Sequence, residues 1–397
     1  MKENSELVQR TKGKRRMKNL FFVLVAFFIF LGVSEVVFRM THLFNARISC
    51  SEPDPVLGWR FTPGRSYWFY KENDHPITGR INRFGWRDRE WSLRPPDGVY
   101  RIAVLGDSYV ESFQVETDRN FLTLTEKEFN KDQNIRLELM NFGRSGFTQT
   151  EELLVLKKQI TQFSPNRVIL FFLPENDLTE ISRETTFELL RPFYHLSPNG
   201  ELMLDTSFVD TREFRIKQWI NFFTHHSALI TLIGERYNLL QAQGLIRKKE
   251  KEHDQKRGQA EKIERYLSLC TDKADRTYLE NYQLSKRLIR AMADYCNERN
   301  IRLMLVTIDT PAYLPEMEAK NKDMDASFNA NFFEDDLKKF AASINIDYLG
   351  LQRIFRESYE KKKVHLHWGH WNYQGHQVVG KALADKLRSI IEREAVR

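Results

Sequence analysis

Arg101-Ile-Ala-Val-Leu-Gly-Asp-Ser108 is the stretch that decides the fold. Its apolar residues, Ile102 to Leu105, predict a buried strand, and Gly106 permits a sharp turn because it has no Cβ to clash. The serine then stands at the carboxyl end of that strand, which is the edge where ligands gather in open α/β sheets. Taken alone, the turn has a second interpretation, in which Asp107 or Ser108 only caps the following helix.

Strands and helices alternate after this stretch. Further apolar strands are predicted at 135–140, 167–173, 302–307 and 344–349. Helical spacing of apolar residues predicts helices near 118–131, 149–162, 275–299, 331–343 and 374–394. Alternation of this kind implies right-handed crossovers, and the sequence therefore predicts a parallel sheet covered by helices on both faces.

The chain of 397 residues divides into four parts by composition. We predict a basic tail at 1–18, an apolar segment at 19–40, an aromatic-rich extension at 41–98, and an α/β domain at 99–397 with an insertion at about 178–275. The net charge is +7, but residues 1–18 hold seven basic and two acidic side chains. The rest of the chain is therefore nearly neutral, which argues against a nucleic-acid partner.

The segment 19–40 is predicted to cross a membrane. Its uncharged run spans Leu20 to Ser34 and the apolar character continues to Phe38, close to the roughly 20 residues that a bilayer requires. The basic tail orients the N-terminus to the cytoplasm. The following domain is then extracytoplasmic (periplasmic), on the cell inner membrane or plasma membrane. A cleaved signal peptide is the competing interpretation, but no small-x-small pair follows the apolar run.

The extension and the insertion carry less decisive patterns. Prolines exclude long helices from 41–98, and four of the seven tryptophans lie there (Trp59, Trp68, Trp86 and Trp91). These rings could stack on sugars, but packing against the main domain is the favoured interpretation. Within the insertion we predict a hairpin at 193–208, a helix at 211–243 and a solvated charged stretch at 247–265. The three cysteines form no disulfide framework.

Four short blocks stand at or beyond the predicted strand ends. They are Gly-Asp-Ser108, Asn-Phe-Gly143, Glu-Asn-Asp177 and Trp368-Gly-His-Trp-Asn-Tyr-Gln-Gly-His376. In this order the blocks resemble those of the SGNH hydrolases, also called the GDSL esterase/lipase superfamily, in a membrane-anchored bacterial form. The resemblance covers roughly residues 53–395. It implies a three-layer α/β/α, flavodoxin-like fold with a parallel sheet, preceded here by the one N-terminal transmembrane helix.

The resemblance also implies roles for matching residues. Ser108 would be the nucleophile and His370 its general base. The N–H groups of Ser108 and Gly143 and the side-chain amide of Asn176 would form the oxyanion hole. The implied reaction is hydrolysis of an ester through an acyl-serine intermediate, without cofactor or metal. The compartment and the aromatic extension favour an acylated surface polysaccharide or glycolipid as substrate.

One departure from the family leaves alternatives open. The family places an aspartate two or three residues before the histidine, where this chain has Trp368 and His367. Either His370 works in a dyad, or an acid from elsewhere orients it; Glu360, Asp347 and Asp177 are the candidates. Two other functions stay open as alternatives to a hydrolase. One is an O-acyltransferase on the same scaffold, and the other is a non-catalytic carbohydrate-binding or assembly member, which the missing aspartate would favour. An acid within reach of the far nitrogen of His370 would favour the enzyme.

A zinc hydrolase is a further alternative. His365, His367, His370 and His376 lie close together in the sequence, and histidine is a common zinc ligand. No cysteine or acid accompanies them in metal-ligand spacing, and the serine blocks account better for His370. We therefore expect no metal, and we expect His376 to anchor the start of the last helix.

Overall fold

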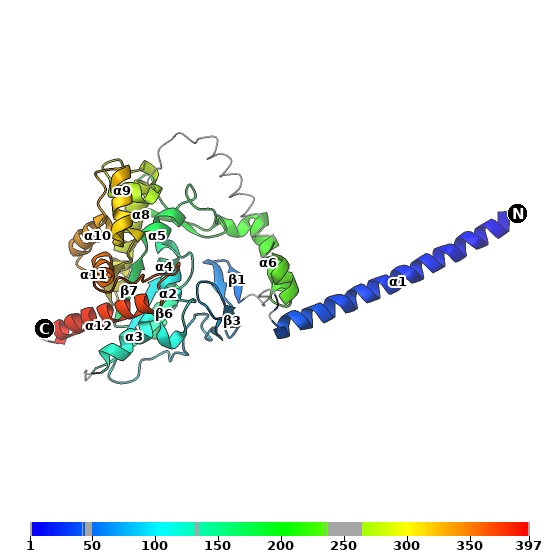
Figure 1. Cartoon of the computed structure of the whole chain (residues 1–397), viewed down its shortest axis with the longest axis horizontal. Coiled ribbons are helices and arrows are strands. Elements are labelled where there is room, and N and C mark those ends of the chain that lie inside the picture. Colours follow the sequence, from blue (N-terminus) through cyan, green and yellow to red (C-terminus); the bar gives the residue numbers. More distant parts are fainter. Residues whose placement is uncertain are drawn as a thin grey trace. The chain divides into compact units, whose positions relative to one another are not determined.

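The computed structural model describes residues 2–41, 43, 50–131, 135–234, 236 and 264–395 (Figure 1). Contacts divide the chain into two compact units. Unit 1 comprises Met1–Ser49 and Ile216–Arg257, and unit 2 comprises Cys50–Arg215 and Gly258–Arg397.

Unit 2 is built on a five-stranded sheet in the order β11-β10-β7-β5-β6. Every neighbouring pair in it is parallel, as predicted. The strands are β5 (Val99–Gly106), β6 (Arg136–Gly143), β7 (Arg167–Phe172), β10 (Arg302–Thr307) and β11 (Asp347–Gly350). Because all five run the same way, their carboxyl ends meet along one edge.

Helices cover both faces of this sheet. Along β5, Ala103 and Leu105 join one apolar core while Ile102 and Val104 join the other, as expected for a strand buried on both faces. The first core is closed by α4 (Gln149–Val155), α8 (Arg276–Asn297) and α10 (Phe332–Ser343). The second is closed by α3 (Phe121–Phe129), α11 (Gln352–Lys362) and α12 (Tyr373–Ala395), with α12 packed along α3 (Figure 1). The predicted three-layer α/β/α fold is confirmed.

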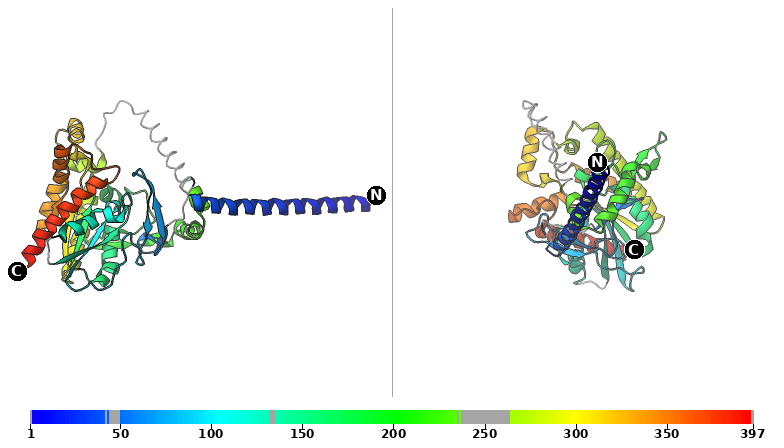
Figure 2. Two further views of the ribbon diagram at one scale, coloured as in Figure 1. Left: turned by 60° about the horizontal axis from the view of Figure 1, so that its bottom comes forward. Right: turned by 90° about the vertical axis from the view of Figure 1, so that its right-hand side faces the viewer.

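Residues 50–98 form short antiparallel pairs in the same unit, seen as blue arrows in Figure 2. The pairs are β1 (Ser51–Asp54) with β2 (Gly58–Phe61), and β3 (Ser66–Phe69) with β4 (Ile77–Arg80). Trp86 and Trp91 are buried in the first core, where both contact Phe142 of β6. These two tryptophans therefore pack against the domain, as the favoured interpretation states.

The connections supply shorter elements. A hairpin of β8 (Phe193–Leu196) and β9 (Leu202–Asp205) lies where it was predicted. The helix predicted at 211–243 is interrupted: α6 covers Arg212–Thr224, and a second helix is described over 228–234. Residues 237–243 of the predicted helix lie outside the described residues. Most of the charged stretch 247–265 lies outside the described residues. The remaining helices include α2 (Ser108–Glu111), α5 (Pro174–Glu180), α9 (Pro315–Met324) and the 3-10 segments η6 (Arg265–Cys270) and η7 (Pro311–Tyr313).

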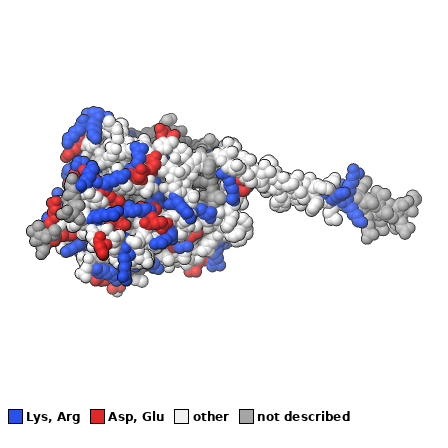
Figure 3. Space-filling view, turned by 90° about the horizontal axis from the view of Figure 1, so that it is seen from below, with Lys and Arg blue, Asp and Glu red and all other residues white. Residues whose placement is uncertain are grey.

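Unit 1 contains the N-terminal helix α1 (Lys2–Thr41). Its part Lys14–Thr41 is long and apolar enough to cross a membrane, with a mean hydropathy of 2.7 in its most apolar window. Lys14, Arg15, Arg16 and Lys18 stand at the start of that part, and Figure 3 shows Lys and Arg gathered there, ahead of an uncharged stretch of the helix. A membrane span and a signal anchor both fit this pattern.

Candidate active site

Ser108 stands at the carboxyl end of strand β5, which lies between β7 and β6 in the sheet. Asp107 caps the short helix α2, since its Oδ1 accepts the Tyr109 N–H at 3.0 Å. Gly106 is required here because a Cβ would lie 2.4 Å from the Val110 side chain. The capping interpretation of the turn is thus correct for Asp107, and the cap leaves the Ser108 hydroxyl half-buried at the sheet edge.

His370 lies against this serine. Its Nε2 is 2.7 Å from Ser108 Oγ, and its ring packs on the Tyr109 ring at a centroid distance of 4.9 Å. The next two residues fix the loop: Trp371 is fully buried and donates its Nε1–H to Asp309 Oδ1 at 3.1 Å. Asn372 Oδ1 accepts two N–H groups of the first turn of α12. The loop therefore presents His370 from a fixed support.

The acid that contacts His370 comes from the extension, and none of the three predicted candidates is used. Glu72 Oε1 accepts from His370 Nδ1 at 2.8 Å. Glu72 Oε2 accepts the backbone N–H of His370 at 2.7 Å and that of Gly369 at 3.2 Å. With Nδ1–H donated to Glu72, Nε2 is free to accept the Ser108 hydroxyl proton.

The three candidates are engaged elsewhere. Asp347 pairs with Arg167 at 2.8 Å and with Arg393 at 3.1 Å. Asp177 is buried and accepts the Leu173 N–H at 2.8 Å. Glu360 lies exposed on α11. The prediction considered only acids near the loops of the site, whereas the acid that contacts His370 lies 298 residues from it, in the extension.

The turn that carries Glu72 is held in an unusual conformation. Glu72 has φ of +72°, a left-handed conformation that costs a non-glycine residue roughly 1–2 kcal/mol. The adjacent Asn73 secures it, donating Nδ2–H groups to the Gln114 carbonyl at 3.0 Å and the Tyr373 hydroxyl at 2.9 Å. Gly369 makes room, because a Cβ there would already lie 3.2 Å from the Glu72 carboxylate. Backbone strain held by specific contacts is typical of functional sites.

Glu72 and His370 each stabilise the charged form of the other. Burial alone would lower the pKa of His370, but the hydrogen bond and charge of Glu72, with the charges of Asp107 and Glu111, raise it above its usual 6.5. Burial alone would raise the pKa of Glu72, yet bonds from His370 and Gly369 lower it below its usual 4.5. A carboxylate thus stabilises the imidazolium that forms when His370 accepts a proton.

The predicted oxyanion donors differ in whether their N–H groups already donate a hydrogen bond within the protein. The N–H of Gly143 is already donated to Asn141 Oδ1 at 2.8 Å, and this Asn141 also donates to the Val110 carbonyl at 2.9 Å to brace α2. Gly143 is a glycine for another reason: a Cβ would meet the α2 backbone at 2.3 Å. The geometry therefore gives Gly143 a structural part, which corrects the expectation of a free donor there.

The loop after β6 offers another backbone donor. Gly146 has φ of +77° and open space beside it. Among the described residues, neither its N–H nor that of Ser108 donates a hydrogen bond. Asn176, at the start of α5, donates one Nδ2–H to the Phe147 carbonyl at 3.2 Å, which leaves its second N–H available. Gly146 lies three residues beyond the predicted donor Gly143, and the sequence alone does not show which of the two N–H groups is already bonded.

The other histidines have separate surroundings. His376 is fully buried and its Nδ1 accepts the Phe121 N–H at 3.1 Å; burial lowers its pKa to about 3. His367 bonds to the Tyr313 hydroxyl at 3.3 Å and lies 3.3 Å from Asp309 Oδ2. Across the described ranges, no three or more His, Cys, Asp or Glu side chains group as metal ligands would. Cys270 and Cys296 are buried free thiols.

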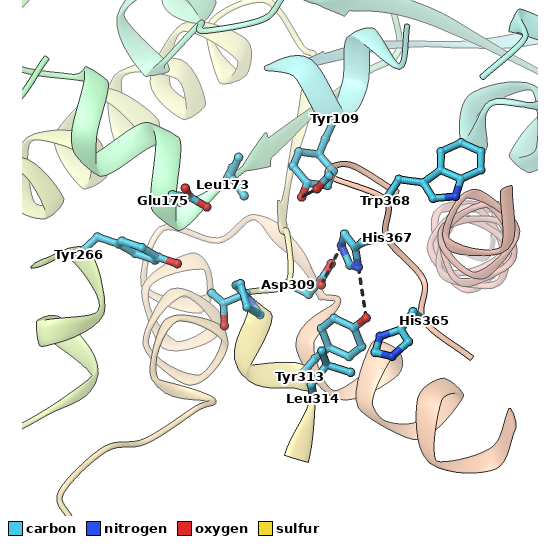
Figure 4. Close-up of a pocket in the computed structure, with 13 residues that line it drawn as sticks. Tyr109, Leu173, Glu175, Tyr266, Asp309, Tyr313, Leu314, His365, His367 and Trp368 are labelled. Carbon is cyan, nitrogen blue, oxygen red and sulfur yellow. Dashed lines mark hydrogen bonds and ion pairs between the residues drawn. The ribbon is translucent and has the colours of Figure 1, made fainter. Parts of the chain in front are cut away.

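A pocket of about 310 Å³ opens beside the histidine loop (Figure 4). Aromatic rings form much of its wall, and polar groups are set between them. Tyr109, whose ring also contacts His370, is one of the wall residues. The lining also includes Tyr266, Tyr313, Trp368, Glu175 and Asp309. Burial raises the pKa of Asp309 to about 8 and lowers that of His367 to about 3, so both are neutral at pH 7.

The site as a whole has the geometry of a Ser-His-acid triad at the carboxyl edge of a parallel sheet. A nucleophile, a base within hydrogen-bond reach and a third group that orients the base define the class of serine hydrolases. The order along this chain is acid, serine, histidine.

Comparison with known proteins gives the following. No protein-family model and no curated protein matches the chain. A solved structure described as a lipolytic protein of the G-D-S-L family, from Desulfitobacterium hafniense DCB-2, aligns over 72% of this chain and 99% of its own, with 10% identity and a TM-score of 0.34. The psychrotrophic esterase EstA from Pseudoalteromonas sp. aligns over 74% and 99%, with 12% identity and a TM-score of 0.35.

A two-domain esterase active on acetylated mannans aligns over 74% of this chain and 50% of its own, with 12% identity and a TM-score of 0.37. The first of these structural neighbours carries the G-D-S-L family description, and that is the family that the sequence blocks resemble.

Proposed function

We propose that this chain is a membrane-anchored, extracytoplasmic serine esterase of the SGNH type. The observation that carries the proposal is the continuous hydrogen-bonded chain Ser108–His370–Glu72, with contacts of 2.7 and 2.8 Å. An acid within reach of the far nitrogen of His370 is the feature that separates an enzyme from a non-catalytic member of the same fold. Trp368, which would fill the acid's place in a binding module, instead points its ring toward Tyr373.

The reaction follows from the roles of these groups. His370 Nε2 accepts the Ser108 hydroxyl proton while Oγ attacks the ester carbonyl. The resulting oxyanion is bound by the N–H groups of Ser108 and Gly146 and by the Asn176 amide. The imidazolium then returns its proton to the leaving alkoxide, which departs as an alcohol. Water repeats the cycle on the acyl-serine and releases the carboxylic acid, whereas a second alcohol in place of water would make the enzyme an O-acyltransferase.

The pocket beside the loop supports an acylated sugar as the substrate. Sugar rings bind on aromatic faces with polar groups at their rims. Tyr109, Tyr266 and Tyr313 supply the rings, Trp368 lies at the edge of the pocket, and Glu175 supplies a charged rim (Figure 4). A surface polysaccharide or glycolipid that bears ester-linked acyl groups fits both this pocket and a domain held at a membrane.

A fluorophosphonate probe tests the nucleophile. We expect the full chain in detergent to gain the mass of one adduct at Ser108, and Ser108→Ala and His370→Ala to gain none. Ser145→Ala is the matched control: this serine lies in a neighbouring loop and hydrogen-bonds to Glu111, so its loss should leave the adduct in place. Absence of labelling, under conditions where a serine esterase standard reacts fully, would refute the proposal.

The pocket is tested separately. We expect Trp368→Ala to raise KM for an acetylated oligosaccharide while leaving kcat/KM for p-nitrophenyl acetate nearly unchanged, because the small ester needs no sugar contact. An equal loss on both esters would show that Trp368 supports the triad and not a sugar site.

A further inference from the structure

Helix α6 exposes an apolar stripe within unit 1. Ile216, Trp219, Ile220 and Phe223 follow the i, i+3, i+4, i+7 spacing of one helix face, and all four are exposed. Phe222 borders the stripe with 62% of its surface exposed, and Trp219 reaches 69%. Large apolar surfaces of this kind mark a partner or a lipid surface.

The segment after α6 is bound to the end of the membrane-length helix α1. The Glu35 carboxylate accepts the Ser227 hydroxyl at 2.8 Å and the N–H groups of Ala228 and Leu229 at 2.8 and 3.0 Å. Arg39, one turn further along α1, donates to the His226 carbonyl. All these residues belong to unit 1.

Apolar packing continues the same contact. Phe38 of α1 packs on Ala228 and Leu232 of the short helix 228–234. On that helix Ile230 and Ile233 remain exposed. Apolar side chains of α1 and of the segment 216–233 therefore lie in one unit, joined at the last turns of α1.

Those last turns are where the apolar run of α1 ends. Between Leu20 and Ser34 the run is uncharged, and Glu35 and Arg39 are the first charges after it. If α1 spans a bilayer, as the proposed function states, Glu35 and Arg39 lie at the level of the lipid headgroups. The hydrogen bonds of Glu35 and Arg39 then hold residues 226–229 at that same level.

We propose that residues 216–233 form a hairpin that lies in the membrane interface, with the α6 stripe inserted among the upper lipid chains. The occupant of the stripe is the lipid of the bilayer that α1 spans. Apolar burial drives the insertion, and Trp219 occupies the interfacial level that tryptophan favours in membrane proteins. This inference rests on the membrane anchoring in the proposed function and adds to it a second, parallel contact with the bilayer.

Tryptophan quenching in lipid nanodiscs tests the proposal. The full chain is reconstituted in phosphatidylcholine with or without bromine on the part of the acyl chain nearest the headgroup. The difference between the wild type and Trp219→Phe then gives the fluorescence of Trp219. We expect brominated lipid to remove most of that signal and aqueous iodide to leave it nearly unchanged. Trp368→Phe isolates a tryptophan from the unit 2 pocket that is 41% exposed, which serves as the iodide-accessible reference.

The other outcomes are distinct. Quenching of Trp219 by iodide and not by brominated lipid overturns the proposal, because the stripe then faces water. Protection from both quenchers also overturns it, in favour of a second copy of the chain or a protein partner over the stripe. Alkaline carbonate extraction of native membranes separates the two hypotheses: a chain released by carbonate lacks the anchor, whereas a retained chain with unquenched Trp219 lacks only the interfacial hairpin.

Discussion

Replacing Glu72 by glutamine tests the least expected feature of the site with almost no change in shape. The carboxylate is bound at one oxygen by two backbone N–H groups, of Gly369 and His370, and at the other by His370 Nδ1–H. In Glu72→Gln the single side-chain oxygen will face the two backbone donors. The new NH₂ group will then face Nδ1, which must become an acceptor, so the proton moves to Nε2. The ring then presents a donor to Ser108 where catalysis needs an acceptor.

The magnitude follows from what the substitution removes. A hydrogen bond to a charged group contributes about 1.5–3 kcal/mol. The attraction between a carboxylate and an imidazolium at about 4 Å is about 4 kcal/mol at an effective dielectric constant of 20. Part of this attraction is lost to water, since the Glu72 and His370 side chains are 21% and 29% exposed. We therefore expect kcat to fall by about 10³–10⁴-fold, which corresponds to about 4–5.5 kcal/mol in the barrier.

The assay is the pH profile of ester hydrolysis, with fluorophosphonate labelling as a second readout. Neutral His370 is the active form, so the wild-type rate rises as pH rises through a His370 pKa above 6.5. Without the charge of Glu72 that pKa falls, and the residual activity of Glu72→Gln should begin at lower pH. Asp74→Asn is the matched control, because Asp74 is in the same turn and its side chain contacts His75. Its backbone N–H donates to Asn73 Oδ1, and the substitution leaves that bond in place. A Glu72→Gln rate within threefold of wild type, with an unshifted profile, would refute the triad.

Three further predictions concern the surrounding groups. Asn176→Ala should lower kcat by about 10²–10³-fold with little change in KM; a change in KM alone would remove Asn176 from the oxyanion site. Gly143→Ala, which forces a Cβ against the α2 backbone, should destabilise the fold by about 3 kcal/mol or more in urea unfolding, whereas Gly146→Ala, with open space, should cost only about 1 kcal/mol; equal costs would contradict the packing argument. Because burial raises the Asp309 pKa to about 8, the folded state holds a proton that the unfolded state releases, so its contribution to stability falls as pH rises from about 4 to 8. Asp309→Asn should remove that slope from the thermal melting profile, and a profile identical to wild type would show that Asp309 is ionised in the folded protein.

The sheet and its serine were predictable because their signals are local. Residues 102–105 and 168–173 are apolar without interruption, which a strand buried on both faces requires. A turn with glycine and an N-capping aspartate then places Ser108 at the edge by covalent connection alone. His370 was found through the four blocks together, since no periodicity marks a catalytic histidine.

The acid was not predictable from the same reasoning. Glu72 lies in a turn between two short strands of the extension, where the sequence shows no helical or strand periodicity. Its approach to His370 depends on long-range contacts of its neighbour Asn73 with Gln114 and Tyr373. Its left-handed φ gives no sequence signal either, because glutamate is not a residue that favours it. One local trace exists: Gly369, next to the histidine, leaves the space that Glu72 fills.

Because Glu72 belongs to the extension, the extension contributes a residue to the proposed active site. In a triad supplied by one loop, the acid and the base are positioned together when that loop folds. Here the base comes from the loop before α12, and the acid comes from a turn between β3 and β4 that must be docked by its own contacts. Loss of the Asn73 bonds would leave Ser108 and His370 at 2.7 Å yet free the acid from a backbone conformation that is strained by roughly 1–2 kcal/mol. Asn73→Ala should therefore lower kcat toward the level of Glu72→Gln while leaving the melting temperature of the domain nearly unchanged. Full activity in Asn73→Ala would mean that the carboxylate's own three hydrogen bonds are sufficient to hold the turn.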